Sequence, residues 1–155
     1  MIILFLKCRK PINKEILERY KKIQIIDSRN LLCEEHLRYA IEQAKKAFER
    51  NQNISKDFFI EVVVRASAQN QIKKAFEIFG LRNSYEVAVF GEEIPKELIK
   101  EHGCEEMKIT PDEERLRRVK KVFNVTDKEI ATRKLSEKEA LLGIIRERMA
   151  LAFAE

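Results

Sequence analysis

Glycine, proline and aromatic residues are scarce in this chain of 155 residues. It contains four glycines, three prolines and no tryptophan, and aromatic residues make up 8% of it. Collagen-like and low-complexity chains need many glycines and prolines, so both classes are excluded. Hydrophobic residues make up 45%, which also excludes a disordered chain. The length predicts one domain, residues 1–155, with a core large enough to fold without a metal or a disulfide.

Cysteine and histidine are also few. Cys8, Cys33 and Cys104 are far apart and form no Cys-x-x-Cys pair, which argues against a zinc site and against a disulfide framework. His36 and His102 are the two histidines. We expect His36 to be solvated beside its neighbouring glutamates and His102 to stabilise a helix end. The sequence therefore predicts no metal and no cofactor.

The motifs of common enzymes are missing as well. The chain has no glycine-rich phosphate loop, no Gly-x-Ser-x-Gly elbow and no His-Glu-x-x-His pair. No apolar run approaches the roughly 18 residues of a membrane span. The opening run of residues 1–6 is too short for a secretory signal. We expect a cytoplasmic, non-catalytic protein that makes no contact with a membrane.

Hydrophobic patterns predict a mixture of strands and helices. The runs that predict strands, with an edge strand last, are Met1–Cys8, Ile23–Ile26, Phe58–Ala66, Tyr85–Phe90 and Met107–Ile109. The segments that predict helices in the first two-thirds of the chain are a short helix from Pro11, then Cys33–Asn51, Ser67–Gly80 with Ser67 as its cap, and Pro95–His102. A βαβ crossover between the third and fourth strands would give a parallel pair.

Three capping boxes predict a helical C-terminal third. They pair Thr110 with Glu113, Thr126 with Glu129, and Ser136 with Glu139, and Pro111 stands at a first helical position. The predicted fold class is α+β (or α/β), a two-layer sandwich in which helices cover a small mixed sheet.

The final helix carries more apolar surface than one core requires. On a helical wheel its apolar arc spans about 200°, whereas a stripe of roughly 100° suffices for a surface helix. The excess predicts a ridge that binds a partner protein. Its members are Leu141, Leu142, Ile145, Met149 and Phe153. The alternative is that this helix is buried between two neighbours.

The segment Arg65–Lys74 has the chemistry of an anion-binding site. Its predicted helix begins with polar, uncharged residues, which leaves backbone N–H groups open to an anion. The amides of Asn70 and Gln71 suit phosphate, sugar or base edges. The candidate residues are Arg65, Asn70, Gln71, Lys73, Lys74 and Arg82. A net charge of +5 permits a polyanionic partner, although an ordinary capped helix explains the segment equally well.

The run S-A-Q-N-Q-I-K-K-A-F-E-I-F-G-L, residues 67–81, resembles the signature of the small KEOPS-complex subunit family, also called the PRPK-binding protein family. The segments around it occur in the order that this family shows. They are the helix of residues 34–50, F-F-I-E-V-V-V-R-A, Y-E-V-A-V-F, I-T-P-D-E-E-R-L-R-R-V-K-K-V-F and L-L-G-I-I-R-E-R-M-A. The resemblance spans residues 30–153.

This resemblance implies a non-catalytic subunit of KEOPS, the complex that installs threonylcarbamoyladenosine in tRNA. It implies that Leu141–Phe153 binds the kinase-like ATPase subunit and that the protein helps to recruit tRNA through its 3′ CCA end. The candidate residues around Asn70 would then contact tRNA, with the basic helix Arg115–Lys121 as a second candidate for phosphate contacts. Two rival hypotheses are a small RNA-processing enzyme with glutamate and lysine as acid and base, and a protein adaptor that binds no nucleic acid.

Overall fold

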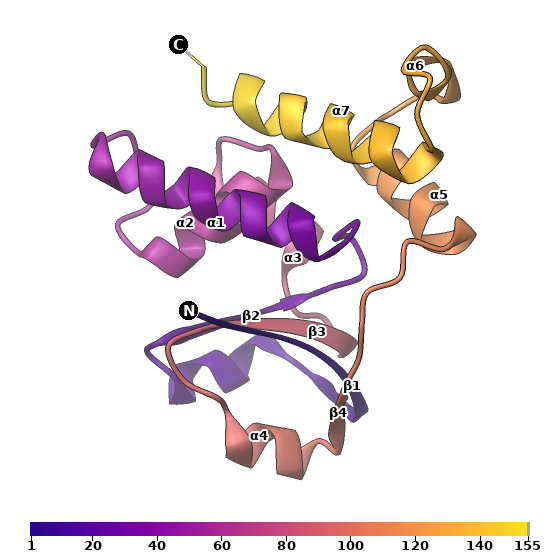
Figure 1. Cartoon of the computed structure of the whole chain (residues 1–155). Helices are drawn as coiled ribbons and strands as arrows, with labels where there is room; N and C mark the ends of the chain where they lie inside the picture. Colours follow the sequence, from indigo (N-terminus) through magenta and orange to yellow (C-terminus); the bar gives the residue numbers. More distant parts are fainter. Residues whose placement is uncertain (155) are drawn as a thin grey trace. The chain divides into compact units, whose positions relative to one another are not determined.

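The computed structural model describes residues 1–154 and has the predicted α+β fold (Figure 1). The chain divides into two compact units. The first, which we call the sheet unit, consists of Met1–Arg29 and Phe79–Lys108. The second, the helical unit, consists of Asn30–Ile78 and the chain from Ile109 onward. Each unit is described by itself below.

The sheet unit contains one four-stranded antiparallel sheet of order β2-β3-β1-β4. Its strands are β1 (Ile2–Ile12), β2 (Ile23–Asp27), β3 (Ser84–Gly91) and β4 (Cys104–Glu106). Its helices are the 3-10 helix η1 (Lys14–Arg19) and α4 (Lys96–Glu101). Leu6, Val89 and Leu98 belong to its core, against which Ile16 and Leu17 of η1 also pack. The predicted strands at β1, β2 and β3 and the helix α4 are confirmed.

Three predictions for this unit were wrong in detail. The sheet is antiparallel throughout the described residues, not mixed. Pro11 lies within β1, where the register with β3 shifts, and such an irregularity tolerates a residue without an N–H. The short helix therefore begins later, at Lys14. The edge strand is β4, which ends at Glu106, just before the predicted Met107–Ile109.

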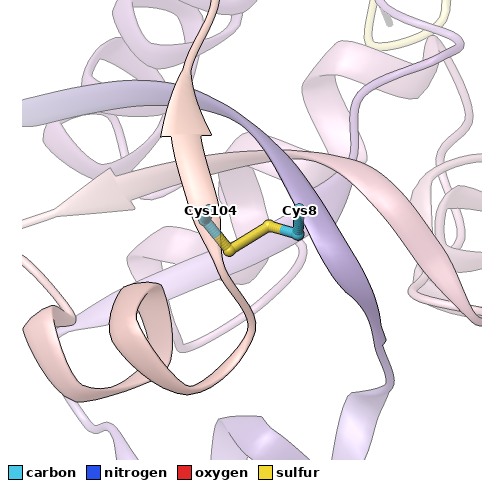
Figure 2. The surroundings of a disulfide bond; sticks show 2 residues. All are labelled: Cys8 and Cys104. Atoms are coloured by element: carbon cyan, nitrogen blue, oxygen red, sulfur yellow. A yellow bond between two sulfur atoms is a disulfide. The ribbon is translucent and has the colours of Figure 1, made fainter.

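A disulfide joins Cys8 of β1 to Cys104 of β4 (Figure 2). The two residues are 96 positions apart in the chain but directly opposite in the antiparallel ladder. The sequence argued against a disulfide framework and did not predict this single pair, because sheet register and not sequence spacing brings the two cysteines together. Cys33 is free and buried.

Thiol labelling checks this disulfide. We expect a thiol reagent to modify one cysteine per chain, Cys33, when the protein is unfolded without a reductant, because Cys8 and Cys104 are bonded. After reduction all three cysteines should be modified. Mass spectrometry of the labelled protein gives the number directly. Modification of three cysteines without reduction would contradict the disulfide.

The helical unit is built from α1 (Glu34–Glu49), α2 (Phe58–Ser67), α3 (Ile72–Phe79, which ends at the unit boundary), α5 (Glu113–Val122), α6 (Asp127–Ala131) and α7 (Glu137–Leu151). The predicted helix Cys33–Asn51 is confirmed by α1. The last helix, α7, contacts α1, α2, α5 and α6, and Figure 1 shows it lying alongside α1. The C-terminal third is helical, as predicted.

The predicted strand Phe58–Ala66 was wrong, because this segment is the helix α2. Asp57 caps the helix by accepting hydrogen bonds from Phe59 N and Ile60 N, and Glu61 pairs with Arg65 one turn later. Buried residues occur on every side of α2, the charged pair Glu61 and Arg65 among them, so no single apolar stripe marks its buried face. A short apolar run of this kind is indistinguishable from a buried strand.

Two of the predicted helix starts are confirmed and two are wrong. Thr126 forms the complete capping box with Glu129, and Ser136 accepts a hydrogen bond from Glu139 N. Asp112, not Thr110, caps α5, so Pro111 precedes that helix. Ser67 is the last residue of α2; its hydroxyl donates to Val64 O and accepts from Gln69 N, so it does not cap α3.

Candidate functional site

A cleft of about 390 Å³ lies where the C-terminal ends of α2, α5 and α7 meet in the helical unit. We call it the cleft. Its lining residues are Ala68, Gln69, Val122, Phe123, Asn124, Arg148, Leu151 and Ala152. It therefore joins the two segments that stood out in the sequence: the run that begins at Ser67 and the final helix.

Two left-handed residues shape the cleft. Ala68 (φ 55°) ends α2, and Asn124 (φ 55°) follows the last turn of α5. Their N–H groups donate to Arg65 O and Lys121 O respectively, as at common helix C-termini. Three helix C-termini place partial negative charge around the cleft, so a positively charged lining residue is stabilised there.

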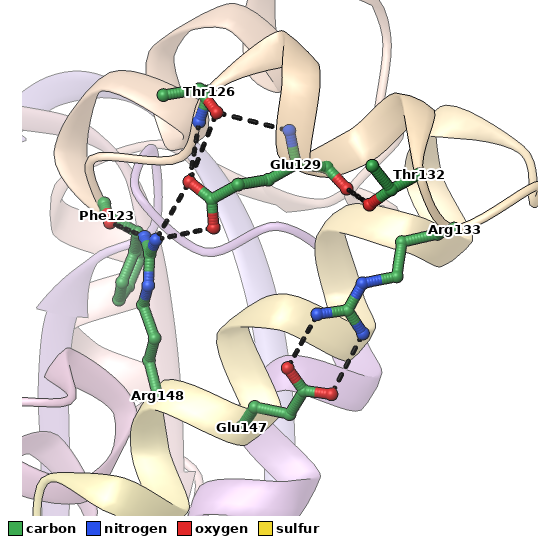
Figure 3. A network of polar contacts seen from close by, with 7 residues as sticks. All are labelled: Phe123, Thr126, Glu129, Thr132, Arg133, Glu147 and Arg148. Atoms are coloured by element: carbon green, nitrogen blue, oxygen red, sulfur yellow. Dashed lines mark hydrogen bonds and ion pairs between the residues drawn. The ribbon is translucent and has the colours of Figure 1, made fainter.

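Arg148 of α7 is that residue (Figure 3). Its Nη1 donates to Phe123 O at the end of α5, and its Nη2 lies 3.0 and 3.2 Å from the two carboxylate oxygens of Glu129 in α6. A hydrogen bond from Thr126 N–H, helped by the Arg148 charge, holds the pKa of Glu129 below its ordinary value. Arg148 is thus bonded within the helical unit at one wall of the cleft.

The predicted partner-binding ridge was wrong for three of its five residues. Leu141, Ile145 and Met149 are buried, because α7 packs against four other helices. On this side of α7 the alternative, a helix covered by its neighbours, is therefore correct. Leu142 and Phe153 are partly exposed. The most exposed large apolar side chain of α7 is Leu151, with 72% of its surface accessible, and it lines the cleft. The prediction did not include Leu151 in the ridge. Leu151 lies at the edge of the apolar arc, and a helical wheel does not show which side of the helix is covered by other helices.

Arg65 was the wrong choice for a surface cation. It is 5% exposed, its Nε lies 2.8 Å from the carboxylate of Glu61, and its Nη2 donates to Gln52 O. The ring of Phe153 lies 3.8 Å from its guanidinium carbon. Its charge is thus neutralised inside the helical unit, and the predicted tRNA contact at this position is withdrawn.

The other predicted RNA-binding residues are exposed. Asn70 and Gln71 precede α3, and Lys73 and Lys74 lie in its first turn; Gln69, the residue before them, lines the cleft. Arg82 is exposed in the sheet unit.

The second candidate segment, Arg115–Lys121, is divided between core and surface. Arg115 is buried and donates to Leu31 O over 2.7 Å, whereas Arg117 and Lys121 are exposed. Only the exposed members of this helix can face phosphate.

His36 is buried, so the prediction of a solvated histidine was wrong. Leu32 N–H donates to its Nδ1 over 3.1 Å and its Nε2 donates to Ala66 O over 2.9 Å. Its ring packs edge-on against Phe123, 5.5 Å between centroids. Burial lowers the pKa of His36 to about 4. This neutral imidazole connects the start of α1 to the end of α2 and supports a residue of the cleft wall.

The low pKa of His36 predicts loss of stability in mild acid. Below pH 6.5 the unfolded chain binds a proton at His36 that the folded protein, with a pKa of about 4, does not bind. This histidine should therefore reduce the free energy of unfolding by roughly 3 kcal/mol as the pH falls from 6.5 to 4.

Urea unfolding of the wild type and of His36→Gln over this range measures the contribution. Glutamine cannot titrate, so the stability difference between the two proteins should narrow as the pH falls. A constant difference would contradict the neutral, buried state.

Among the described residues neither the free cysteine nor a metal-binding group offers a reactive centre. Burial raises the pKa of the Cys33 thiol to about 11, so it is protonated and a poor nucleophile. No group of three or more histidine, cysteine or acidic side chains within residues 1–154 could hold a metal ion. None of the helices in this part of the chain is both long and apolar enough to cross a bilayer.

Comparison with known proteins agrees with the predicted resemblance. Residues 7–152 match the family model described as kinase binding protein CGI-121. The chain is 30% identical over 141 residues to the regulatory protein Cgi121 of Methanocaldococcus jannaschii, and the alignment covers 88% of this chain and 93% of that protein. The family match and the alignment with this relative together span nearly all of both units. The chain therefore belongs to the CGI-121 family of kinase binding proteins.

Proposed function

We propose that this protein is a non-catalytic regulatory subunit of KEOPS that binds the kinase-like ATPase subunit and helps to recruit tRNA by its 3′ CCA end. The observation that carries the proposal is the match of residues 7–152 to a family of kinase binding proteins. The regulatory name of the archaeal relative supports it.

The kinase-like partner would contact the exposed C-terminal end of α7. Leu151 presents an exposed apolar side chain there, and Phe153, two residues further along the chain, is partly exposed. An apolar anchor on a helix is a frequent centre of a protein interface. Glu147, four residues before Leu151 and therefore on the same side of the helix, is exposed and places a polar group beside it.

The tRNA end would lie along the residues before and within the first turn of α3. Single-stranded nucleotides are recognised by hydrogen bonds to base edges and by neutralisation of their phosphates. Asn70 and Gln71 offer amide donors and acceptors, and Lys73 and Lys74 offer charge; all four are exposed. Gln69 continues the amide series into the cleft.

Partner binding is tested by Leu151→Glu. We expect this variant to lose co-elution with the kinase-like subunit, or to bind at least about tenfold more weakly, because a hot-spot side chain contributes 1.4 kcal/mol or more. Its melting temperature should not change, since Leu151 is exposed. Ile94→Glu, a substitution of an exposed apolar residue in the sheet unit, is the matched control. Equal binding by both variants would contradict the placement at α7.

tRNA binding is tested by the charge reversal Lys73→Glu with Lys74→Glu. Its control is the reversal of Lys45 and Lys46, an exposed pair on α1. We expect the first double variant alone to lose tRNA affinity, and wild-type affinity to fall steeply with salt. Removal of the CCA end should lower the affinity of the wild type for tRNA more than the charge reversal does. Absence of wild-type binding at low salt would instead indicate a protein adaptor, and turnover of tRNA by the isolated chain would indicate an enzyme.

A further inference from the structure

One side of α7 carries an exposed cation that is not part of an ion pair. Arg146 is exposed, and no carboxylate within residues 1–154 pairs with its guanidinium. The other arginine of α7, Arg148, differs in this respect, because it is paired with Glu129 at 3.0 Å. The charge of Arg146 is therefore available to a ligand.

Tyr39 of α1 holds this guanidinium in place. The guanidinium carbon of Arg146 lies 4.4 Å from the centre of the Tyr39 ring, inside the range of roughly 6 Å for a cation–π contact. Gln43, one turn after Tyr39, donates to Met149 O over 2.9 Å and so fixes α1 against α7 at this point. A long and flexible side chain is thus oriented before any ligand binds.

Two carboxylates that are close to this pair in the chain have other partners. Glu147, the residue after Arg146, accepts two hydrogen bonds from Arg133 at 2.7 and 2.9 Å (Figure 3). Glu42 of α1 lies 3.6 Å from Lys45. A carboxylate that pairs with Arg146 therefore has to come from another molecule.

Apolar side chains flank Arg146 along α7. Leu142 and Ala150 lie one turn before and one turn after it, and Phe153 lies two turns after it, so all three are on its side of the helix. Leu142 and Phe153 are partly exposed, and Ala150 is exposed. We call these three residues, together with Arg146 and Tyr39, the arginine surface. It contains the two members of the predicted ridge that are not buried.

We infer that the arginine surface binds the kinase-like partner and that Arg146 pairs there with a carboxylate of that protein. A planar guanidinium can bond both oxygens of a carboxylate. Tyrosine and arginine are also enriched among the residues that contribute most to protein interfaces. The apolar neighbours favour a protein over a nucleic acid, because a nucleic-acid site needs several cations and the arginine surface has one.

The inference rests on the proposed function and adds the chemistry that the partner has to present, which is an acidic side chain among apolar ones. It also adds a contact that is separate from Leu151. The two residues lie about 140° apart around α7, so Arg146 and Leu151 can be tested independently.

The affinity of the kinase-like subunit for single variants tests the role of Arg146. We expect Arg146→Ala to bind about tenfold more weakly or worse, with an association rate that depends less on salt than that of the wild type. Arg146→Lys should recover only part of the loss, because an ammonium group cannot form the two-bonded pair. Arg117→Ala, at an exposed arginine of α5, is the matched control and should bind as the wild type does.

Tyr39 is a positioning residue in this account. We expect Tyr39→Leu to bind the kinase-like subunit about two- to fivefold more weakly, as expected for loss of an exposed cation–π contact. Tyr39→Phe keeps the ring and should bind as the wild type does. Melting temperatures of both variants show whether each is folded. Equal binding by the two variants would contradict the positioning role.

Three results would overturn the inference. The first is equal binding of the partner by Arg146→Ala and the wild type, and the second is an equal loss in Arg117→Ala. The third is a loss of tRNA affinity in Arg146→Ala while partner binding is unchanged, which would assign this cation to a phosphate group. The proposed function fails separately, if the wild type does not bind the kinase-like subunit.

Discussion

Replacing Met149 with glutamate is expected to unfold the helical unit, not merely to weaken partner binding. Met149 is fully buried in α7, and its backbone carbonyl accepts a hydrogen bond from Gln43 of α1 over 2.9 Å. A carboxylate at this position must either stay charged in an apolar core or bind a proton at neutral pH. Documented buried glutamates have a pKa near 8 or 9, which corresponds to a cost of roughly 5 kcal/mol.

Circular dichroism during urea unfolding measures this effect. The matched comparison is Leu151→Glu, two residues along the same helix, where the new charge meets solvent. We expect the Met149 variant to lose its cooperative transition or most of its stability, and the Leu151 variant to match the wild type. A stable Met149→Glu protein would show that this side of α7 is free, as the sequence had predicted.

Replacing Glu61 with glutamine should cost roughly 3–5 kcal/mol, because it leaves the buried charge of Arg65 without its partner. Glu61 is fully buried. Its carboxylate accepts hydrogen bonds from Ile54 N, Ser55 N and Arg65 Nε at 2.8, 2.7 and 2.8 Å. A glutamine presents one NH2 group to this set of donors and cannot neutralise the guanidinium.

A second glutamate in the same helical geometry provides the control. Glu34 and Arg38 of α1 are also four residues apart and paired, at 2.6 Å, but both are exposed. Glu34→Gln should therefore change the free energy of unfolding by about 0.5 kcal/mol or less. Denaturant unfolding of both variants compares the pairs directly. Similar small losses would contradict the burial of the Glu61–Arg65 pair.

Local chemistry predicted much of the fold correctly. The strands β1, β2 and β3 are rich in apolar and β-branched residues, α1 has a clear apolar stripe, and Thr126 and Ser136 cap the helices that follow them. These signals come from residues that are close together in the chain, so they can be recognised in a single sequence. The helix α2 was missed because it is short and buried on all sides, and the pattern of such a run does not distinguish it from a buried strand.

The candidate site was predictable only in part, because it depends on contacts between distant segments. The sequence singled out the two segments that meet in the cleft, but not that Arg65 turns inward to Glu61. Nor did it show that His36 accepts a hydrogen bond and is covered by Phe123. Leu151 has no distinguishing neighbour in the sequence. Its exposure follows from the packing of the other helices around α7.

The most direct test of the account is hydrogen exchange of the wild-type protein alone and in complex with its kinase-like partner. If the exposed end of α7 is the interface, amides of residues 146–153 should become protected on binding. Those of the sheet unit should exchange as they do in the free protein. Protection confined to the sheet unit, with residues 146–153 unchanged, would contradict the account.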